Sequence, residues 1–202
     1  MYTLYFSPGT CALATHAILN ELGQTVKIVD RANAENFEKL NPVGAVPVLK
    51  DGDLVLTEGA AILLHLLDKH PNPLLPKEGI DRSTALSDML FANATMHPAY
   101  GRLFFVSQLN IDSKTKQTVL EAAAGAINAL WQVVEARLQT QSFLGGETPS
   151  PADFLLAVYS SWGGAFPVDI KIGPQGRQMI EAIQSRPGYQ LALNEQQSKA
   201  AA

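Results

Sequence analysis

Cysteine is almost missing from this chain of 202 residues, which contains only Cys11. A single cysteine cannot form an internal disulfide, and a lone thiol is typical of a reducing compartment. The N-terminal segment MYTLYFSPGT has neither the basic start nor the long apolar stretch of a secretory signal peptide. No segment approaches the roughly 18 consecutive apolar residues that a transmembrane helix needs. We therefore expect a cytoplasmic protein without a membrane partner.

Positive charge is also scarce. Fifteen lysines and arginines stand against nineteen acidic residues, which gives a net charge of −4. This balance argues against a protein whose main task is to bind nucleic-acid phosphate, so no nucleic-acid partner is expected. Charged residues make up 17% of the chain and hydrophobic residues 47%, which excludes disorder as the main state.

Several catalytic motifs are missing. The chain has no GxxxxGK[ST], no GxGxxG after a strand, no HExxH and no GxSxG. Its four histidines and one cysteine are scattered, which argues against a metal site, so no metal cofactor is expected. Any chemistry must come from a different arrangement of residues.

Strand and helix signals alternate through the N-terminal part, which we predict to be a domain of residues 1–76. The expected elements are a strand at 2–6, a helix at 11–22, a strand at 25–30, a short helix at 33–40, strands at 46–50 and 53–56, and a helix at 60–70. The first two strands would run parallel through a right-handed crossover, and the last two would form a hairpin. This order predicts a mixed α/β sheet covered by helices.

Strand signals almost vanish after Pro76. Pro71, Pro73 and Pro76 predict a stiff linker, and apolar residues at helical spacing indicate two long helices, at 81–106 and 115–140. The second part is therefore predicted to be an all-helical domain of residues 81–202.

Two shorter helices complete this domain. The segment Ser150-Pro151-Ala152-Asp153 has the pattern of an N-cap, a proline in the first helical position and an acid near the helix start. A further helix is expected from about Gly173 or Gln175 to Ser185, and the tail from Asn194 onward looks loose.

Cys11 stands out by its position in the first turn of the first helix. The unpaired N–H groups of a helix N-terminus favour a thiolate, either that of Cys11 or that of a ligand. If Cys11 lies there, its pKa is expected below the free value of roughly 8.5. A small buried residue on the inner face of the helix is an equally good interpretation.

Two junctions between elements are further candidates. A cis bond between Val46 and Pro47 would free the backbone of Val46 to pair with an extended peptide, whereas a trans proline at a sheet edge is the commoner alternative. At Glu58 and Gly59, exposed N–H groups could hold a ligand carboxylate and Glu58 could hold an ammonium group. The alternative there is an ordinary helix N-cap with an acid beside it.

His97 is the remaining candidate. It belongs to a stripe of the first long helix that we predict to face inward. The stripe comprises Leu86, Leu90, Asn93, His97 and Tyr100. Pro98 follows immediately and must kink or strain the helix, because it removes a backbone hydrogen bond. A histidine at such a kink could meet a ligand, although a core or interface histidine is the commoner case.

Taken together, these features resemble the glutathione transferase family, and its bacterial beta-type members most closely. The segments that carry the resemblance are YFSPGTCALATH (5–16), LNPVGAVPVL (40–49), TEGAAIL (57–63), MHPAYGRLF (96–104) and SPADFLLA (150–157). The resemblance implies a thioredoxin-like α/β N-terminal domain that binds glutathione, and an all-α C-terminal domain that completes a site for an apolar co-substrate.

The resemblance also implies roles for individual residues. Val46, before a cis Pro47, would pair through its backbone with the cysteinyl unit of glutathione. Glu58 and Gly59 would hold the γ-glutamyl end.

Two further residues would act on the sulfur. Cys11 would sit against it, and His97 would approach it from the helical domain. Asp153, with Ser150 as its partner, would be a structural N-cap.

The expected function is therefore conjugation of glutathione to small hydrophobic electrophiles, with glutathione-dependent thiol–disulfide or peroxide reduction as a further activity. A homodimer is implied as well. The alternative is a non-catalytic relative that binds or regulates, and an isomerase or dehalogenase of the same fold is a lesser option.

Overall fold

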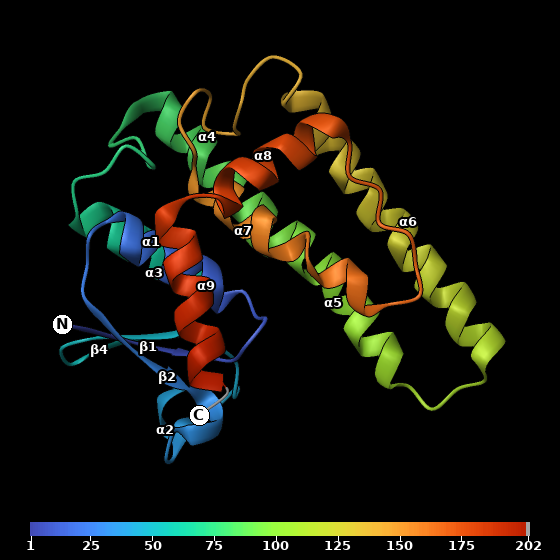
Figure 1. Cartoon of the computed structure of the whole chain (residues 1–202), viewed down its shortest axis with the longest axis horizontal. Coiled ribbons are helices and arrows are strands. Elements are labelled where there is room, and N and C mark those ends of the chain that lie inside the picture. Colours follow the sequence, from blue (N-terminus) through green and yellow to red (C-terminus); the bar gives the residue numbers. More distant parts are fainter. Residues whose placement is uncertain (201–202) are drawn as a thin grey trace. The chain divides into compact units, whose positions relative to one another are not determined.

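Residues 1–200 are described in a computed structural model (Figure 1). The chain forms two compact units: unit 1 combines Met1–Lys77 with the segment that begins at Ile183, and unit 2 is Glu78–Ala182. The domains expected from the sequence, 1–76 and 81–202, differ from these units in the C-terminal segment, which groups with the α/β part.

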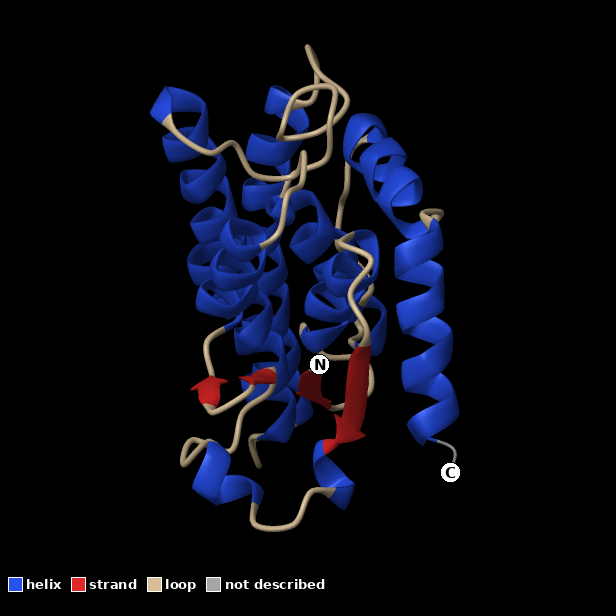
Figure 2. Cartoon of the chain, turned by 90° about the vertical axis from the view of Figure 1, so that its left-hand side faces the viewer, coloured by secondary structure: helices blue, strands red, loops and turns tan. Residues whose placement is uncertain are grey.

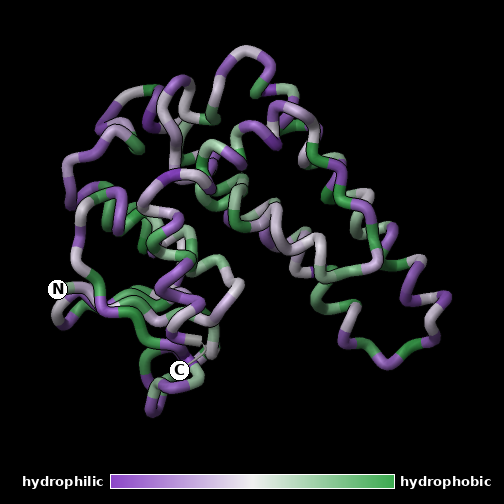
Figure 3. The backbone as a smooth tube through the Cα atoms, in the orientation of Figure 1, coloured by the Kyte–Doolittle hydropathy of each residue, from purple (hydrophilic) through white to green (hydrophobic). Residues whose placement is uncertain are grey.

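Unit 1 is built on a four-stranded mixed sheet in the order β2-β1-β3-β4. The strands are β1 (Tyr2–Phe6), β2 (Val26–Asp30), β3 (Val48–Asp51) and β4 (Leu54–Leu56). β1 and β2 are parallel, whereas β3 is antiparallel to both β1 and β4. Figure 3 shows much of this sheet in the green of hydrophobic residues. The predicted mixed sheet is confirmed.

Helices cover this sheet and complete its core. They are α1 (Ala12–Glu21), α2 (Phe37–Leu40), α3 (Gly59–Lys69) and α9 (Pro187–Ala200), with a 3₁₀ turn η1 (Arg31–Asn33) after β2. Alternate residues of β1 are buried, and Leu4 packs in one cluster with Leu19 of α1, Leu49 of β3 and Ile62 of α3. Burying each such side chain contributes about 1.5–3 kcal/mol.

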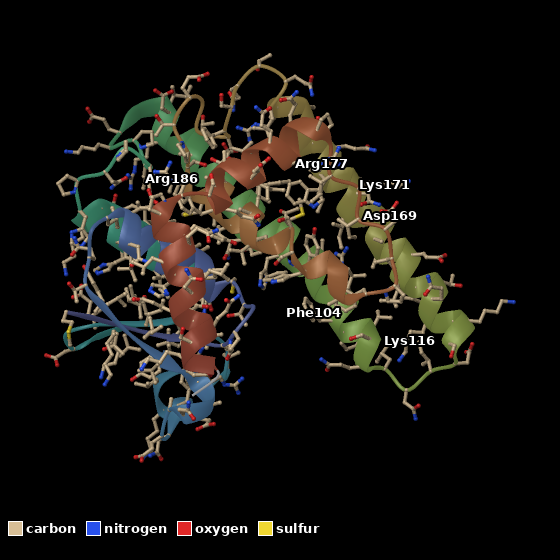
Figure 4. The ribbon with its side chains drawn as sticks, viewed as in Figure 1. Phe104, Lys116, Asp169, Lys171, Arg177 and Arg186 are labelled. Atoms are coloured by element: carbon tan, nitrogen blue, oxygen red, sulfur yellow. The ribbon has the colours of Figure 1, made fainter. Side chains whose placement is uncertain are left out.

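The C-terminal helix α9 packs against α1 (Figure 1), and Figure 2 shows α9 as the helix beside the C-terminal mark. The side-chain amide of Asn20 donates to the carbonyl of Gly188 at 3.0 Å, and Arg186, labelled in Figure 4, pairs with Glu21. A Cβ at Gly188 would lie 2.6 Å from a Glu21 carboxylate oxygen, so glycine permits this approach.

The prediction of a loose tail from Asn194 is therefore wrong as far as Ala200, because α9 buries residues such as Gln196. Ala201 and Ala202 lie outside the described residues.

Unit 2 consists of helices. They are α4 (Gly79–Leu90), a π-helical turn η2 (Phe91–Met96), α5 (His97–Gln108), α6 (Ser113–Arg137), α7 (Pro151–Tyr159), a 3₁₀ turn η3 (Trp162–Ala165) and α8 (Pro174–Gln184), in which the unit ends. α5 and α6 pack side by side (Figure 1). No helix in the described part of the chain combines the length and apolarity needed to cross a membrane.

A buried acid organises the start of α7. The Asp153 carboxylate accepts hydrogen bonds from the N–H of Leu144 at 2.9 Å and from the N–H and hydroxyl of Ser150 at 2.7 and 2.8 Å. Together these two residues form a capping box. Burial raises the pKa of Asp153, while these hydrogen bonds oppose the rise. Asp153 thus has the structural N-cap arrangement that the family resemblance implies.

Candidate functional site

Cys11 lies at the N-cap of α1, one residue before the helix begins. The chain leaves β1 at Phe6 and turns sharply, with the Thr10 hydroxyl donating to the Ser7 carbonyl at 2.7 Å. Gly9 has a φ of +73°, a conformation that glycine adopts without strain. This turn therefore places the thiol beside the first N–H groups of the helix, where the sequence predicted it.

The surroundings of the Cys11 thiol differ from the prediction. Burial raises its pKa to about 11, and the charge of Glu58 adds to the rise, while the N–H groups of Cys11 and Ala12 oppose it. The expectation of a lowered pKa is therefore wrong in this structure, because loss of water around the sulfur outweighs the helix N-terminus. At neutral pH Cys11 is a protonated thiol, and its S–H points to the carbonyl of Val46 at 3.7 Å.

The second junction precedes β3. The Val46–Pro47 bond is cis, and β3 begins only at Val48, so the N–H of Val46 lies outside the strand ladder. The loop before it is held by Asn41, whose amide donates to the carbonyl of Ala45 at 2.8 Å.

Sequence reasoning missed this role of Asn41. An asparagine that precedes a proline in a turn is the signal that could have indicated it.

Glu58 is the N-cap residue of α3, but its side chain makes no capping bond to its own helix. Its backbone carbonyl accepts the Ile62 N–H at 2.9 Å, which is the first bond of the helix. The carboxylate is exposed, and the N–H groups of the first turn, from Gly59 on, have no partner within the helix. Glu58 thus occupies the N-cap position, as the alternative of an ordinary helix N-cap expects, while its carboxylate makes no capping bond to the helix.

Three of the candidate residues thus come together within unit 1. Cys11 lies against the Val46 carbonyl, and the Glu58 carboxylate is near enough to act on the Cys11 thiol through its charge. Residues that are 35 positions apart meet because β1 and β3 are neighbours in the sheet, which aligns the turn after one with the loop before the other.

His97 belongs to unit 2, at the start of α5. Its half-buried ring meets Tyr159 and Trp162 edge-on, with centroid distances of 5.2 Å in both pairs. Burial lowers the pKa of His97, so its imidazole is neutral at pH values near neutrality.

The stripe predicted to contain His97 is wrong in part. Tyr100 is buried as predicted, but Leu90 is 50% exposed, and the other side chains that face the core lie beside the predicted ones. The buried face comprises Ala85, Met89, Ala92, Met96 and Tyr100. Leu90 and His97 therefore flank this face, which leaves His97 accessible from one side.

The contacts of His97 continue into a group of aromatic side chains within unit 2. Phe104 of α5, labelled in Figure 4, is 40% exposed and meets Trp162 and Phe166 edge-on, at 5.9 and 4.9 Å. The sequence could not separate these residues from core aromatics, because spacing along a helix does not show which aromatic side chains reach the surface.

Metal ligands do not gather in the described part of the chain: residues 1–200 contain no group of three or more His, Cys, Asp or Glu side chains suited to hold an ion.

Two family models match the chain. Residues 2–74 match the glutathione S-transferase N-terminal domain, and residues 93–182 match the glutathione S-transferase C-terminal domain. Together the two matches span most of the chain.

A curated bacterial protein is similar over most of its length. The chain is 34% identical to glutathione S-transferase GST-4.5 of Xanthomonas campestris over 173 residues, which cover 83% of this chain and 85% of that protein.

Solved structures show the same similarity. A sphingomonad glutathione S-transferase complexed with glutathione matches with a TM-score of 0.84 and 29% identity, covering 96% of this chain and 98% of that one. A beta class glutathione S-transferase from Sphingomonas chungbukensis matches with a TM-score of 0.83 and 28% identity, over the same shares of the two chains.

Proposed function

The chain belongs to the glutathione S-transferase family and is an enzyme of that family, and from this premise we propose that it conjugates glutathione to small hydrophobic electrophiles. Glutathione is the co-substrate and binds in unit 1. The observation that carries this proposal is the convergence of the Cys11 thiol, the Val46 backbone and the Glu58 carboxylate described above.

The γ-glutamyl end of glutathione carries one ammonium and one carboxylate group. The exposed Glu58 carboxylate suits the ammonium group, and the N–H groups at the start of α3, beginning with Gly59, suit the carboxylate. The N–H of Val46, next to Pro47, is available for the peptide group of the cysteinyl unit, as an added strand would use it. These three contacts place the sulfur of glutathione toward Cys11.

Cys11 acts in this proposal as a hydrogen-bond donor. Because its own thiol stays protonated near neutral pH, its S–H can donate to the thiolate of glutathione, together with N–H groups at the start of α1. Each unit by which these donors lower the pKa of the glutathione thiol corresponds to about 1.4 kcal/mol of preferential stabilisation of the thiolate. The abundant thiolate then attacks the electrophile.

The raised pKa of the Cys11 thiol also indicates which of the two activities expected from the sequence should be faster. Thiol–disulfide exchange through Cys11 needs its thiolate, which is scarce near neutral pH. Conjugation needs only the thiolate of glutathione. We therefore propose conjugation as the main activity, with disulfide or peroxide reduction as a slower one.

We include His97 in the proposed site because the family resemblance implies that it approaches the sulfur of glutathione. Its neutral imidazole can accept a proton or donate a hydrogen bond. The partly exposed ring of Phe104, which packs against the buried Trp162, suits an apolar electrophile. We also propose that the protein is a cytoplasmic homodimer that serves detoxification.

Retention on immobilised glutathione, followed by assay with an aromatic chloride, an epoxide, an organic peroxide and a glutathione mixed disulfide, tests the proposed function. We expect retention and the fastest turnover with the aromatic chloride. Retention without turnover of any compound would contradict conjugation and favour the non-catalytic alternative. Turnover of the mixed disulfide alone would reverse the ranking of the two activities.

A further inference from the structure

Pro98 lies within a helical run that continues from Gly79 to Gln108 without a break. The run is α-helical at both ends and π-helical in the middle, in η2, which ends one residue before His97. The N–H of His97 donates to the carbonyl of Ala92, five residues back, where an α-helix would pair it with a residue four back. The π-helical turn, which is wider than an α-helical turn and is called the wide turn below, therefore ends just before His97 and Pro98.

The position of the wide turn has a physical reason. Proline has no N–H, and in a regular α-helix its ring collides with the carbonyl four residues back, which is that of Ala94. A wide turn moves the carbonyls of the preceding turn away from the ring and passes the lost hydrogen bond to other partners. Pro98 is itself exposed, so packing against its ring does not explain the turn.

The turn also decides where the His97 ring lies. A π-helical turn inserts about one residue, which corresponds to a rotation of about 100° around the helix axis. The neighbours of His97 show what such a rotation changes, because Met96 is fully buried and Pro98 is exposed. In the present register His97 is half-buried and meets Tyr159 and Trp162 edge-on.

We propose that Pro98 is a positioning residue: it maintains the π-helical turn of residues 91–96 and thereby holds the His97 imidazole against Tyr159 and Trp162. The effect of Pro98 on catalysis rests on the proposed function, in which His97 takes part. The effect of Pro98 on the placement of the His97 ring does not rest on the proposed function, and it can be measured without glutathione.

The variant Pro98→Ala tests this proposal. Alanine restores the missing N–H and favours a regular α-helix, so the register of His97 can shift by about one position. In the NMR titration of the histidine C–H protons, with the His97 signal assigned by its loss in His97→Asn, we expect the pKa of His97 to rise toward the ordinary value. The Trp162 fluorescence, read in a Trp131→Phe background, is expected to change its pH dependence as well.

A matched control is available in the same unit. Pro174 is also exposed and opens the helix α8, but it stands at a true helix start, where the missing N–H has no cost. Pro174→Ala is expected to leave the His97 titration unchanged. A merely structural effect of Pro98→Ala would shift the melting temperature and leave the titration of the folded protein as it is.

An unchanged His97 titration in folded Pro98→Ala, with the wide turn still present in its crystal structure, would overturn the proposal. Conjugation is measured separately on the same variants across pH, and we expect the pH profile of turnover to move with the pKa of His97. If the wild type does not conjugate at all, the proposed function fails, while the titration still decides the role of Pro98.

Discussion

At the scale of single residues, the Glu58 carboxylate is the group on which glutathione binding is expected to depend most. Glu58→Ala removes the partner of the ligand ammonium, and we expect the dissociation constant to rise by about ten- to hundredfold. Isothermal titration calorimetry measures this directly. Asp53→Ala is the control, because Asp53 is an exposed acid in the turn between β3 and β4. Equal affinities for Glu58→Ala and the wild type would contradict the assignment.

The reactivity of Cys11 follows from its burial. With a pKa of about 11, the thiol should react slowly with iodoacetamide near neutral pH, and the rate should rise about tenfold per pH unit as the thiolate fraction grows. Cys11 is the only cysteine, so mass spectrometry follows its labelling without ambiguity. A rate that reaches its plateau already at about pH 8 would instead support the lowered pKa predicted from the helix N-terminus.

Substitution of Cys11 separates its two possible roles. Cys11→Ala should abolish reduction of glutathione mixed disulfides that proceeds through this thiol, while conjugation is reduced but present, because backbone donors remain. Cys11→Ser keeps a donor and should retain more conjugation than Cys11→Ala. Complete loss of conjugation in both variants would show that Cys11 is more than one donor among several.

At the scale of elements, Asp153 is the residue that ties a loop to a helix. Asp153→Ala leaves the buried N–H groups of Leu144 and Ser150 without their acceptor, and we expect a loss of about 3–5 kcal/mol in the free energy of unfolding. Urea denaturation measures the loss. Asp112→Ala removes the exposed N-cap of α6 and should cost clearly less. Equal losses in the two variants would show that burial of the cap adds nothing.

The packing of α9 on α1 is expected to depend on pH through His16. This histidine is fully buried and its Nε2 lies 3.0 Å from a carboxylate oxygen of Glu195, yet burial lowers its pKa more than Glu195 raises it. The unfolded chain then binds the proton more readily, so the contribution of His16 to stability is full above about pH 6.5 and is lost as the pH falls below it.

Urea denaturation between about pH 5 and 8 tests the direction of this pH dependence of stability. We expect stability to decrease toward the acidic end, and to decrease less in His16→Asn. His97, whose pKa is also lowered, contributes in the same direction, so His97→Asn is measured alongside. A wild type that becomes more stable as the pH falls would show that the ion pair with Glu195 dominates.

At the scale of the whole molecule, the predicted homodimer requires an exposed apolar surface through which two copies make contact. The apolar side chains of α3 do not supply one, because Ile62, Leu63, Leu66 and Leu67 are buried inside unit 1. Exposed apolar side chains stand instead on α4, where Ile80 is 81% and Leu90 is 50% exposed. We propose this helix as part of the contact between two copies.

Sedimentation equilibrium at micromolar concentration should give twice the 21.7 kDa of one chain. Leu90→Glu should shift the equilibrium toward the monomer, since it places a charge in an apolar contact. Leu191→Glu on α9 is the matched control, because Leu191 is equally exposed. A monomeric wild type would refute the dimer, and an effect of Leu191→Glu alone would move the contact to another helix.

The sequence by itself determined the features that depend on neighbours along the chain. Alternation and helical spacing predicted the strands of unit 1 and the helices of both units except α9, and turn residues predicted where they end. Because the proposed binding residues Cys11, Val46 and Glu58 lie at such ends, they could be named from their positions. The capping box of Asp153 is equally local.

Only the tertiary structure decided the features that depend on distant neighbours. The pKa of Cys11 rises because other segments exclude water from its sulfur, which no pattern around residue 11 records. Leu90 is exposed and Met89 buried because packing in unit 2 selects one of two adjacent helix faces. The segment that begins at Ile183 groups with unit 1 because α1 offers it a complementary surface more than 160 residues away, and contacts at that separation form only in the folded chain.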